Sequence, residues 1–194
     1  MRFRWISALP LLAMLAACGE KAEQDSQPIE VVGGNAQLPA GPAPQEVRGQ
    51  DFASAVLGSL DFSLASARAA AERSERPATK AFAQTLVTGF SAARQELADT
   101  AAAAGLKATP AAGATDQSDL AILLSTRGAA LETVFAEQQV ERLTQLLGTV
   151  RAYKNGGDNP ALRAWAEKHQ GTITDRLLDL QMLKAELEEA TPNP

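Results

Sequence analysis

Apolar residues recur every three or four positions over most of the chain beyond residue 50. In residues 51–74 this apolar series consists of Phe52, Val56, Leu60, Leu64, Ala67 and Ala71. Because an α-helix has 3.6 residues per turn, the spacing places these side chains on one helical face. Residues 77–105 repeat the pattern. Pro77 suits the first turn of this second helix, and Gly105 suits its C-terminal cap.

A third helical region follows a loop of small residues at 108–115. Asp116 or Ser118 is its expected N-terminal cap, and Gly128 marks a break within it. Its apolar series is Leu120, Leu123, Leu124, Leu131, Val134, Phe135, Leu143, Leu146, Leu147, Val150 and Tyr153. The sequence Asn155-Gly156-Gly157 ends the region, because paired glycines interrupt helices.

The last predicted helix begins after Asp158 or Asn159, either of which can cap it, with Pro160 at its first position. Its apolar positions are Leu162, Trp165, Ala166, His169, Ile173, Leu177, Leu180, Leu183 and Leu187, with His169 lying on the same face. No single amphipathic helix can bury its apolar face alone. The pattern therefore predicts an all-α domain, an antiparallel four-helix bundle, over residues 51–190.

The N-terminal pattern differs from the helical pattern. Arg2 and Arg4 precede an apolar run at residues 5–17, which ends at Cys18. A helix of about 13 residues spans roughly 20 Å, which is shorter than the ~30 Å hydrocarbon core of a membrane. Residues 1–17 are therefore predicted to be a signal peptide.

The segment Leu15-Ala16-Ala17-Cys18 resembles the lipobox of bacterial lipoproteins. The resemblance implies that the Cys18 thiol is acylated and that the peptide is cut just before it. Gly19 follows, in place of the Asp associated with retention at the inner membrane. By that analogy the protein is expected at the outer membrane, facing the periplasm. The alternative is an ordinary signal peptide beside an accidental cysteine.

Residues 18–50 are predicted to be a lipidated cysteine followed by a flexible tether. The segment contains no aromatic residue and is rich in proline and glycine, at Pro28, Pro39, Pro42, Pro44, Gly33, Gly34, Gly41 and Gly49. Such a segment buries too little apolar surface to offset the entropy of ordering it. As a flexible chain it would span roughly 30 Å. Its one apolar cluster, residues 29–32, leaves a short strand as an alternative.

Composition restricts the function classes further. Aromatic residues make up 5% of the 194 residues, and the net charge is −5. Removal of residues 1–17 leaves 16 Lys and Arg against 23 Asp and Glu, a net charge of −7. Nucleic-acid binding needs a basic surface, so no nucleic-acid partner is expected. A single cysteine and a single histidine argue against a disulfide framework, a zinc site and a Cys/His catalytic pair.

Several short motifs of the helical region resemble the domain-of-unknown-function 4142 family of ferritin-like, outer-membrane or periplasmic proteins. The motifs are Ala71-Glu72-Arg73-Ser74, Pro77-Ala78-Thr79-Lys80-Ala81-Phe82-Ala83-Gln84, Gln139-Val140 and Asp158-Asn159-Pro160-Ala161-Leu162-Arg163-Ala164-Trp165-Ala166. The likeness covers residues 51–187. It implies a ferritin-like four-helix fold and no established activity.

The chain departs from this family at its usual histidines. An Asp-His pair is replaced by Gly89 and Phe90, and a later histidine is replaced by Leu143. A Pro and a His of the last helix are replaced by Gly171 and Arg176. If these histidines bind a metal or a proton in relatives, this chain has lost that capacity.

The remaining candidate chemistry is sparse. A di-iron site in a helix bundle needs two Glu-x-x-His pairs, and the chain contains no such pair. Glu132, Glu137 and Glu141 are expected to form a solvated acidic face. His169 is expected to be a packing histidine or one at the rim of the bundle. The alternatives for His169 are a pH-sensitive group or part of a ligand pocket.

The sequence favours a non-enzymatic protein that is anchored by lipid at Cys18 and acts as an envelope interaction or scaffold module. A protein partner or a second copy is expected, with no cofactor and no metal. The alternative is a ferritin-like metal-binding or stress-related protein whose usual histidines are lost. A small-ligand carrier is a third possibility, and it predicts a pocket larger than ~300 Å³ among the helices.

Overall fold

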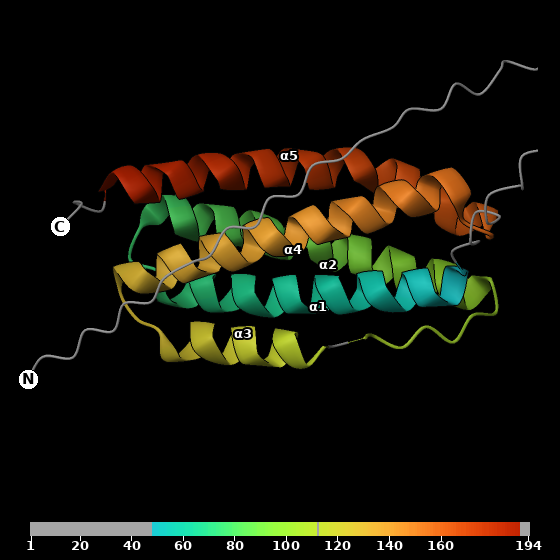
Figure 1. Ribbon diagram of the computed structural model, residues 1–194, viewed down its shortest axis with the longest axis horizontal. Coiled ribbons are helices and arrows are strands. Elements are labelled where there is room, and N and C mark those ends of the chain that lie inside the picture. The colour runs from blue at the N-terminus through green and yellow to red at the C-terminus, as the bar shows by residue number, and fades with distance from the viewer. Residues whose placement is uncertain (1–47, 112, 191–194) are drawn as a thin grey trace, which may run out of the picture. The chain divides into compact units, whose positions relative to one another are not determined.

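A computed structural model describes residues 48–111 and 113–190. Within these residues the chain forms five helices and no strand, so the prediction of an all-α protein is confirmed (Figure 1). The helices are α1 (Gly49–Arg73), α2 (Pro77–Ala103), α3 (Ala114–Ser125), α4 (Ala129–Gly156) and α5 (Pro160–Ala190). The predicted signal peptide, Cys18 and almost all of the predicted tether lie outside the described residues.

The four long helices pack as a ring of neighbours. Helix α1 contacts α2 and α4, and α5 contacts the same two helices. Short turns join α1 to α2 and α4 to α5, so each of these pairs runs antiparallel (Figure 1). Helix α3 is shorter and lies outside this ring, against α1 and α4.

The apolar faces predicted from the sequence meet in one core. Its largest fully buried apolar side chains include Phe52, Phe90, Phe135, Leu60, Leu86, Leu97, Leu131, Leu143, Leu146 and Leu162. Each such side chain stabilises the fold by roughly 1.5–3 kcal/mol relative to its exposed state. At one end of the core, Phe52 stacks on Tyr153 with a centroid separation of 3.9 Å. Trp165 meets the same Phe52 ring edge-on at 6.1 Å.

The third predicted helical region is two helices in the structure. Gly128 has a positive φ of 60° and separates α3 from α4. Helix α3 begins earlier than the expected cap, with Gly113 as the N-cap residue. Asp116 lies in its first turn and accepts a hydrogen bond of 3.1 Å from the Gly113 amide. Asp116 and Ser118 both lie inside α3, so the prediction that one of them is its N-cap is wrong.

Two other predicted helix ends have the expected chemistry. After α2, the Gly105 amide bonds to the Ala102 carbonyl and the Leu106 amide bonds to the Ala101 carbonyl. This pair of bonds defines a Schellman cap, and Gly105 has the positive φ of 72° that the cap requires. Before α5, the Asn159 side-chain oxygen accepts hydrogen bonds from two amides in the first turn. Asn159 is therefore the cap of α5.

None of the helices in residues 48–111 and 113–190 combines the length and apolar character needed to cross a membrane.

Candidate functional site

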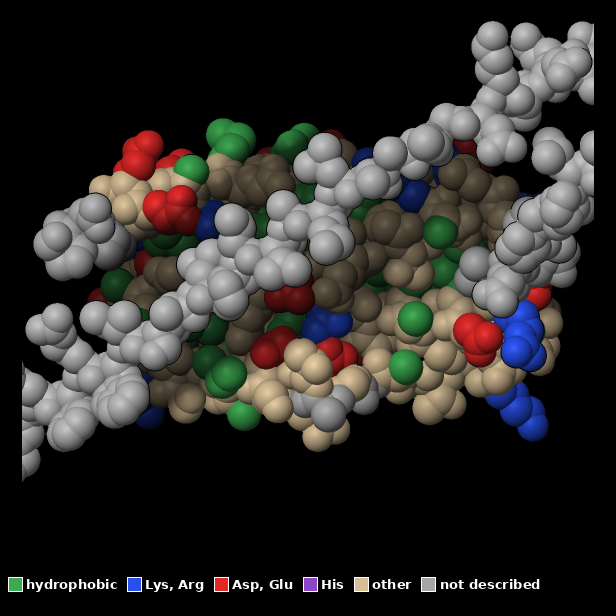
Figure 2. Space-filling model, viewed as in Figure 1, with side chains coloured by type: hydrophobic (Ala, Val, Ile, Leu, Met, Phe, Trp, Pro, Cys, Tyr) green, Lys and Arg blue, Asp and Glu red, His purple; other side chains and the backbone are tan. Residues whose placement is uncertain are grey.

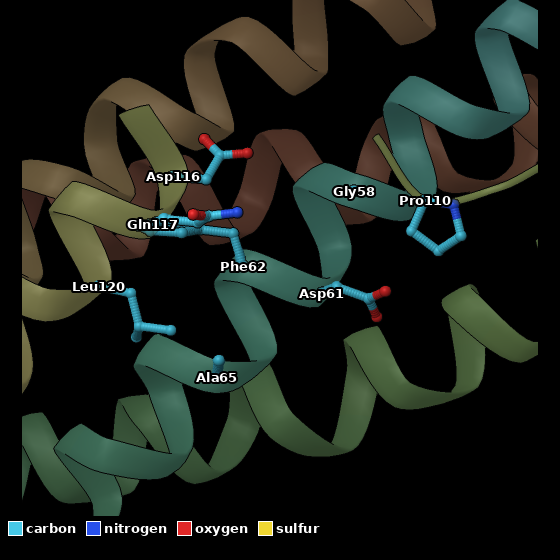
Figure 3. Close-up of a pocket in the computed structure, with 8 residues that line it drawn as sticks. All are labelled: Gly58, Asp61, Phe62, Ala65, Pro110, Asp116, Gln117 and Leu120. Atoms are coloured by element: carbon cyan, nitrogen blue, oxygen red, sulfur yellow. The ribbon is translucent and has the colours of Figure 1, made fainter. Parts of the chain in front are cut away.

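The site residue predicted from the sequence, Cys18, lies outside the described residues. In the described part of the chain, an apolar pocket lies between α1 and α3 (Figure 3). It has a volume of about 200 Å³ and is lined by Gly58, Asp61, Phe62, Ala65, Pro110, Asp116, Gln117 and Leu120.

Helical periodicity explains how α1 forms one side of this pocket. Gly58, Asp61, Phe62 and Ala65 follow one another at intervals of three, one and three residues, so they share a face of α1. Phe62 is buried but is not one of the residues that form the hydrophobic core. Phe62 on this face therefore points away from the core. Phe62 is only 5% exposed because α3 and its surroundings cover it.

Arg142 of α4 also covers Phe62. Its guanidinium carbon lies 4.7 Å from the centre of the Phe62 ring. A guanidinium in this position is attracted by the negative face of the ring. The same guanidinium forms an ion pair with Asp116 at the start of α3. Arg142 thereby links α4 to both helices that form the pocket.

The polar groups at the pocket are mostly paired. Asp61 forms an ion pair with Arg94 of α2, and Asp116 pairs with Arg142. The Asp61–Arg94 pair is partly exposed to solvent, which screens its charges. The exposed Gln117 adds an amide at the mouth of the pocket.

The connection between α2 and α3 forms the wall of the pocket at Pro110. The Ala111 amide donates a hydrogen bond of 3.0 Å to the Ser54 carbonyl, and the Thr109 amide bonds to the Ser54 hydroxyl at 3.2 Å. A Cβ atom on Gly58 would lie 2.2 Å from the Ala111 carbonyl oxygen. Only glycine at position 58 lets the connection pack this closely on α1.

A second hollow of about 490 Å³ shares Asp116 with the pocket and is lined by α1, α3 and α4. Its charged lining residues are Asp116, Asp119, Glu141 and Arg142. Figure 2 shows acidic side chains gathered around basic ones where the start of α3 lies against α1 and α4. Three carboxylates against one guanidinium give this hollow an acidic character.

The expectation of a solvated acidic face is wrong for Glu132. This residue is 3% exposed, and its carboxylate accepts hydrogen bonds from the Ser74 hydroxyl and from the backbone amides of Glu75 and Arg76. Burial raises the pKa of Glu132, but these hydrogen bonds and the Arg76 guanidinium lower it, and the result is a pKa below the usual range. Glu137 and Glu141 are exposed, as predicted.

His169 is a partnered residue between α5 and α2. Its Nε2 atom lies 3.0 Å from a carboxylate oxygen of Glu96, and its ring packs 4.5 Å from the Trp165 ring. The Lys168 ammonium donates to the same carboxylate at 2.7 Å. This bond is the main cause of a lowered Glu96 pKa, with His169 contributing in the same direction. The geometry fits a packing histidine.

The five positions at which the resemblance implies replaced family residues hold no metal-binding side chain. Phe90 and Leu143 are buried apolar side chains. Gly89 and Gly171 are exposed, and Arg176 pairs with Asp179. Within the residues that the structure describes, no group of three or more His, Cys, Asp or Glu side chains is arranged to hold a metal ion.

Comparison with known proteins identifies the family. The profile described as "Domain of unknown function (DUF4142)" matches residues 35–183, and the chain belongs to this family. No curated protein and no solved structure matches the chain.

The pocket itself was not predicted from the sequence. Phe62 lies outside the apolar series of residues 51–74, between Leu60 and Leu64, and this offset is the one available signal. An apolar side chain on the outer face of a helix needs a further element to cover it. The sequence does not say that α3 is that element.

Proposed function

We propose that the chain is a non-enzymatic, lipid-anchored protein of the bacterial envelope that acts as an interaction or scaffold module. The observation that carries this proposal is the segment Leu15-Ala16-Ala17-Cys18 at the end of a short apolar run. A thiol at this position accepts the acyl chains of bacterial lipoproteins. Each buried CH₂ group of such a chain contributes about 0.8 kcal/mol to membrane binding.

The proposal places a ferritin-like, antiparallel four-helix bundle at the end of a tether. Thirty residues separate Cys18 from α1, which begins at Gly49. If flexible, a linker of this length spans roughly 30 Å, so the bundle would reach partners in the periplasm while remaining anchored. Gly19 after the cysteine supports the outer membrane as the final location.

A non-catalytic role agrees with the chemistry of the described side chains. His169 is held by Glu96 and packs against Trp165. Glu132 is engaged by four hydrogen-bond donors at the turn between α1 and α2. Both groups therefore have structural roles in the packing of the helices, and the proposal assigns a catalytic role to neither.

Membrane fractionation of a Cys18→Ala strain tests this function. The unaltered protein is expected in the outer-membrane fraction, and Cys18→Ala is expected to leave that fraction or to retain its signal peptide. Gly19→Asp is the matched variant, and it is expected to move the processed protein to the inner membrane. A Cys18→Ala protein that is processed and membrane-bound like the original would contradict the anchor. Stoichiometric iron or manganese in the purified protein would favour the metal-binding alternative.

A further inference from the structure

The pocket between α1 and α3 has the dimensions of a site for one side chain. Its volume of about 200 Å³ is below the roughly 300–1,000 Å³ of pockets that enclose small organic ligands. An apolar cavity of roughly 150 Å³ is large enough for benzene, so a phenyl ring fits here. The pocket is also open to solvent on one side.

The apolar surface continues beyond the pocket along α3. Leu120 lines the pocket, and Leu124 lies one helical turn later on the same side of α3. Leu124 is 51% exposed, so the apolar surface that begins at Leu120 in the pocket extends onto the solvent-exposed side of α3. A ligand confined to the pocket would leave Leu124 in water, whereas a polypeptide that enters the pocket with one side chain can also cover Leu124.

The charges around the pocket select among polypeptides. The pocket and the adjoining hollow contain four carboxylates, those of Asp61, Asp116, Asp119 and Glu141. Among the described residues, two guanidiniums form ion pairs with these carboxylates, those of Arg94 and Arg142. The excess of negative charge favours a segment with Lys or Arg next to the inserted side chain, because complementary charge speeds and orients association.

We propose that the pocket between α1 and α3 is a docking site for a protein segment that inserts one aromatic side chain flanked by basic residues. Phe62 forms an aromatic wall of the site, Ala65 and Leu120 complete its apolar lining, and Gln117 stands at its mouth. A single buried aromatic anchor often dominates the affinity of an interface. The proposal rests on the proposed function, since it names the kind of partner that an envelope interaction module would take.

The test uses the full-length chain in lipid nanodiscs, with empty nanodiscs as the blank. The probe is the capped peptide Gly-Lys-Xaa-Lys-Gly, where Xaa is 4-fluorophenylalanine, observed by the broadening of its ¹⁹F signal. Saturable broadening is expected, and the same peptide with alanine at Xaa should not displace the probe. A peptide with Glu in place of both Lys residues should bind about fivefold more weakly.

Two variants locate the binding. Ala65→Trp fills the pocket and should weaken probe binding by tenfold or more, as loss of an anchor does. Ala92→Trp makes the same change at an exposed position of α2 and should leave binding unchanged. Gln117→Lys alters only an exposed side chain at the mouth, so it keeps the fold. This substitution should weaken binding of the peptide that carries two Lys residues and strengthen binding of the peptide that carries two Glu residues.

Several results would overturn the proposal. These are an absence of saturable broadening, equal binding by Ala65→Trp and the unaltered chain, and binding of 4-fluorotoluene as tight as that of the peptide. The last result would assign the pocket to small molecules. None of them bears on Cys18, so failure of this inference is distinct from failure of the lipid anchor.

Discussion

The carboxylate of Glu132 on α4 accepts a hydrogen bond of 2.8 Å from the backbone amide of Arg76, the residue that precedes α2. The first amides of a helix have no partner within the helix. The N-cap position of α2 is occupied by Arg76, which provides no capping side chain. The Glu132 carboxylate provides the missing acceptor, although it lies 56 residues further along the chain. It also accepts hydrogen bonds from the Ser74 hydroxyl and the Glu75 amide. One carboxylate thus fastens the turn between α1 and α2 to α4.

We expect Glu132→Gln to lower the free energy of unfolding by about 2 kcal/mol, because hydrogen bonds to a charged acceptor are worth roughly 1.5–3 kcal/mol. The substitution keeps the size of the side chain but removes its charge. Urea unfolding followed by circular dichroism measures the change. Glu137→Gln on the exposed side of α4 is the matched control and should change stability by less than ~0.5 kcal/mol. Equal effects of the two substitutions would show that the hydrogen bonds of Glu132 do not contribute to the free energy of unfolding.

The contribution of Glu132 should depend on pH in a defined direction. Its pKa is lower in the folded protein than the ordinary value of 4.5. The extra stability is therefore fully present above pH 4.5 and is lost as the pH falls through the lowered folded pKa. The difference between the urea midpoints of the unaltered chain and Glu132→Gln, measured from pH 3 to pH 7, should become smaller toward the acid end. A difference that grows toward low pH would contradict the assignment.

Tyr153 should titrate at unusually high pH. Burial is the main cause that raises the pKa of Tyr153 to about 12, and its hydrogen bond to Asp158 acts in the same direction. Tyr153 is the only tyrosine in the chain, so absorbance at 295 nm reports it alone. The midpoint should fall to about 10 in denaturant. Stability should accordingly decline between about pH 10 and pH 12, since the unfolded state ionises first.

Asp158→Asn provides the control for the Tyr153 titration. The substitution removes the negative charge beside the phenol and leaves the burial of the ring in place. The midpoint should move down but stay above about 10. A native midpoint near 10 in the unaltered chain would show that the phenol is solvated and that the packing at this end of the core is wrong.

Two adjacent glycines at the end of α4 should respond oppositely to alanine. A Cβ atom on Gly157 would lie 2.5 Å from the Tyr153 ring, whereas a Cβ atom on Gly156 would meet nothing within 4 Å. Gly157→Ala should therefore destabilise the fold by about 2 kcal/mol, through overpacking. Gly156→Ala lies within the helix and should stabilise it by about 0.5–1 kcal/mol. Thermal unfolding of both variants checks the pair, and a matching sign would contradict the packing of Tyr153 against Gly157.

The helices could be predicted because their signals are local. The apolar series, Pro77, Gly105 and Asn159 each act within a few residues of their own position. Glu132 and Phe62 could not be assigned in this way, because their environments come from residues far away in the chain. The sequence around Glu132 is typical of an exposed helical glutamate, but in the structure the turn at Ser74 covers this side chain. Phe62 does not fit the apolar series of residues 51–74, and its burial is explained only by the packing of α3 over it.

The pocket illustrates the same limit. Asp116 is not the N-cap that the sequence predicts, but from the first turn of α3 it bonds to the amide of the N-cap residue, Gly113. Its second role, the ion pair with Arg142 beside Phe62, depends on the approach of α4. Arg142 is separated from Asp116 by 26 residues, and no sequence pattern specifies their contact.

Mass spectrometry of the mature polypeptide tests the proposed anchor most directly. The protein isolated from its native membrane should begin at Cys18, and its N-terminal peptide should carry the mass of thioether-linked diacylglycerol. A chain that begins elsewhere, or that retains an unmodified Cys18 behind an intact leader, would contradict the assignment of this protein as a lipid-anchored module of the envelope.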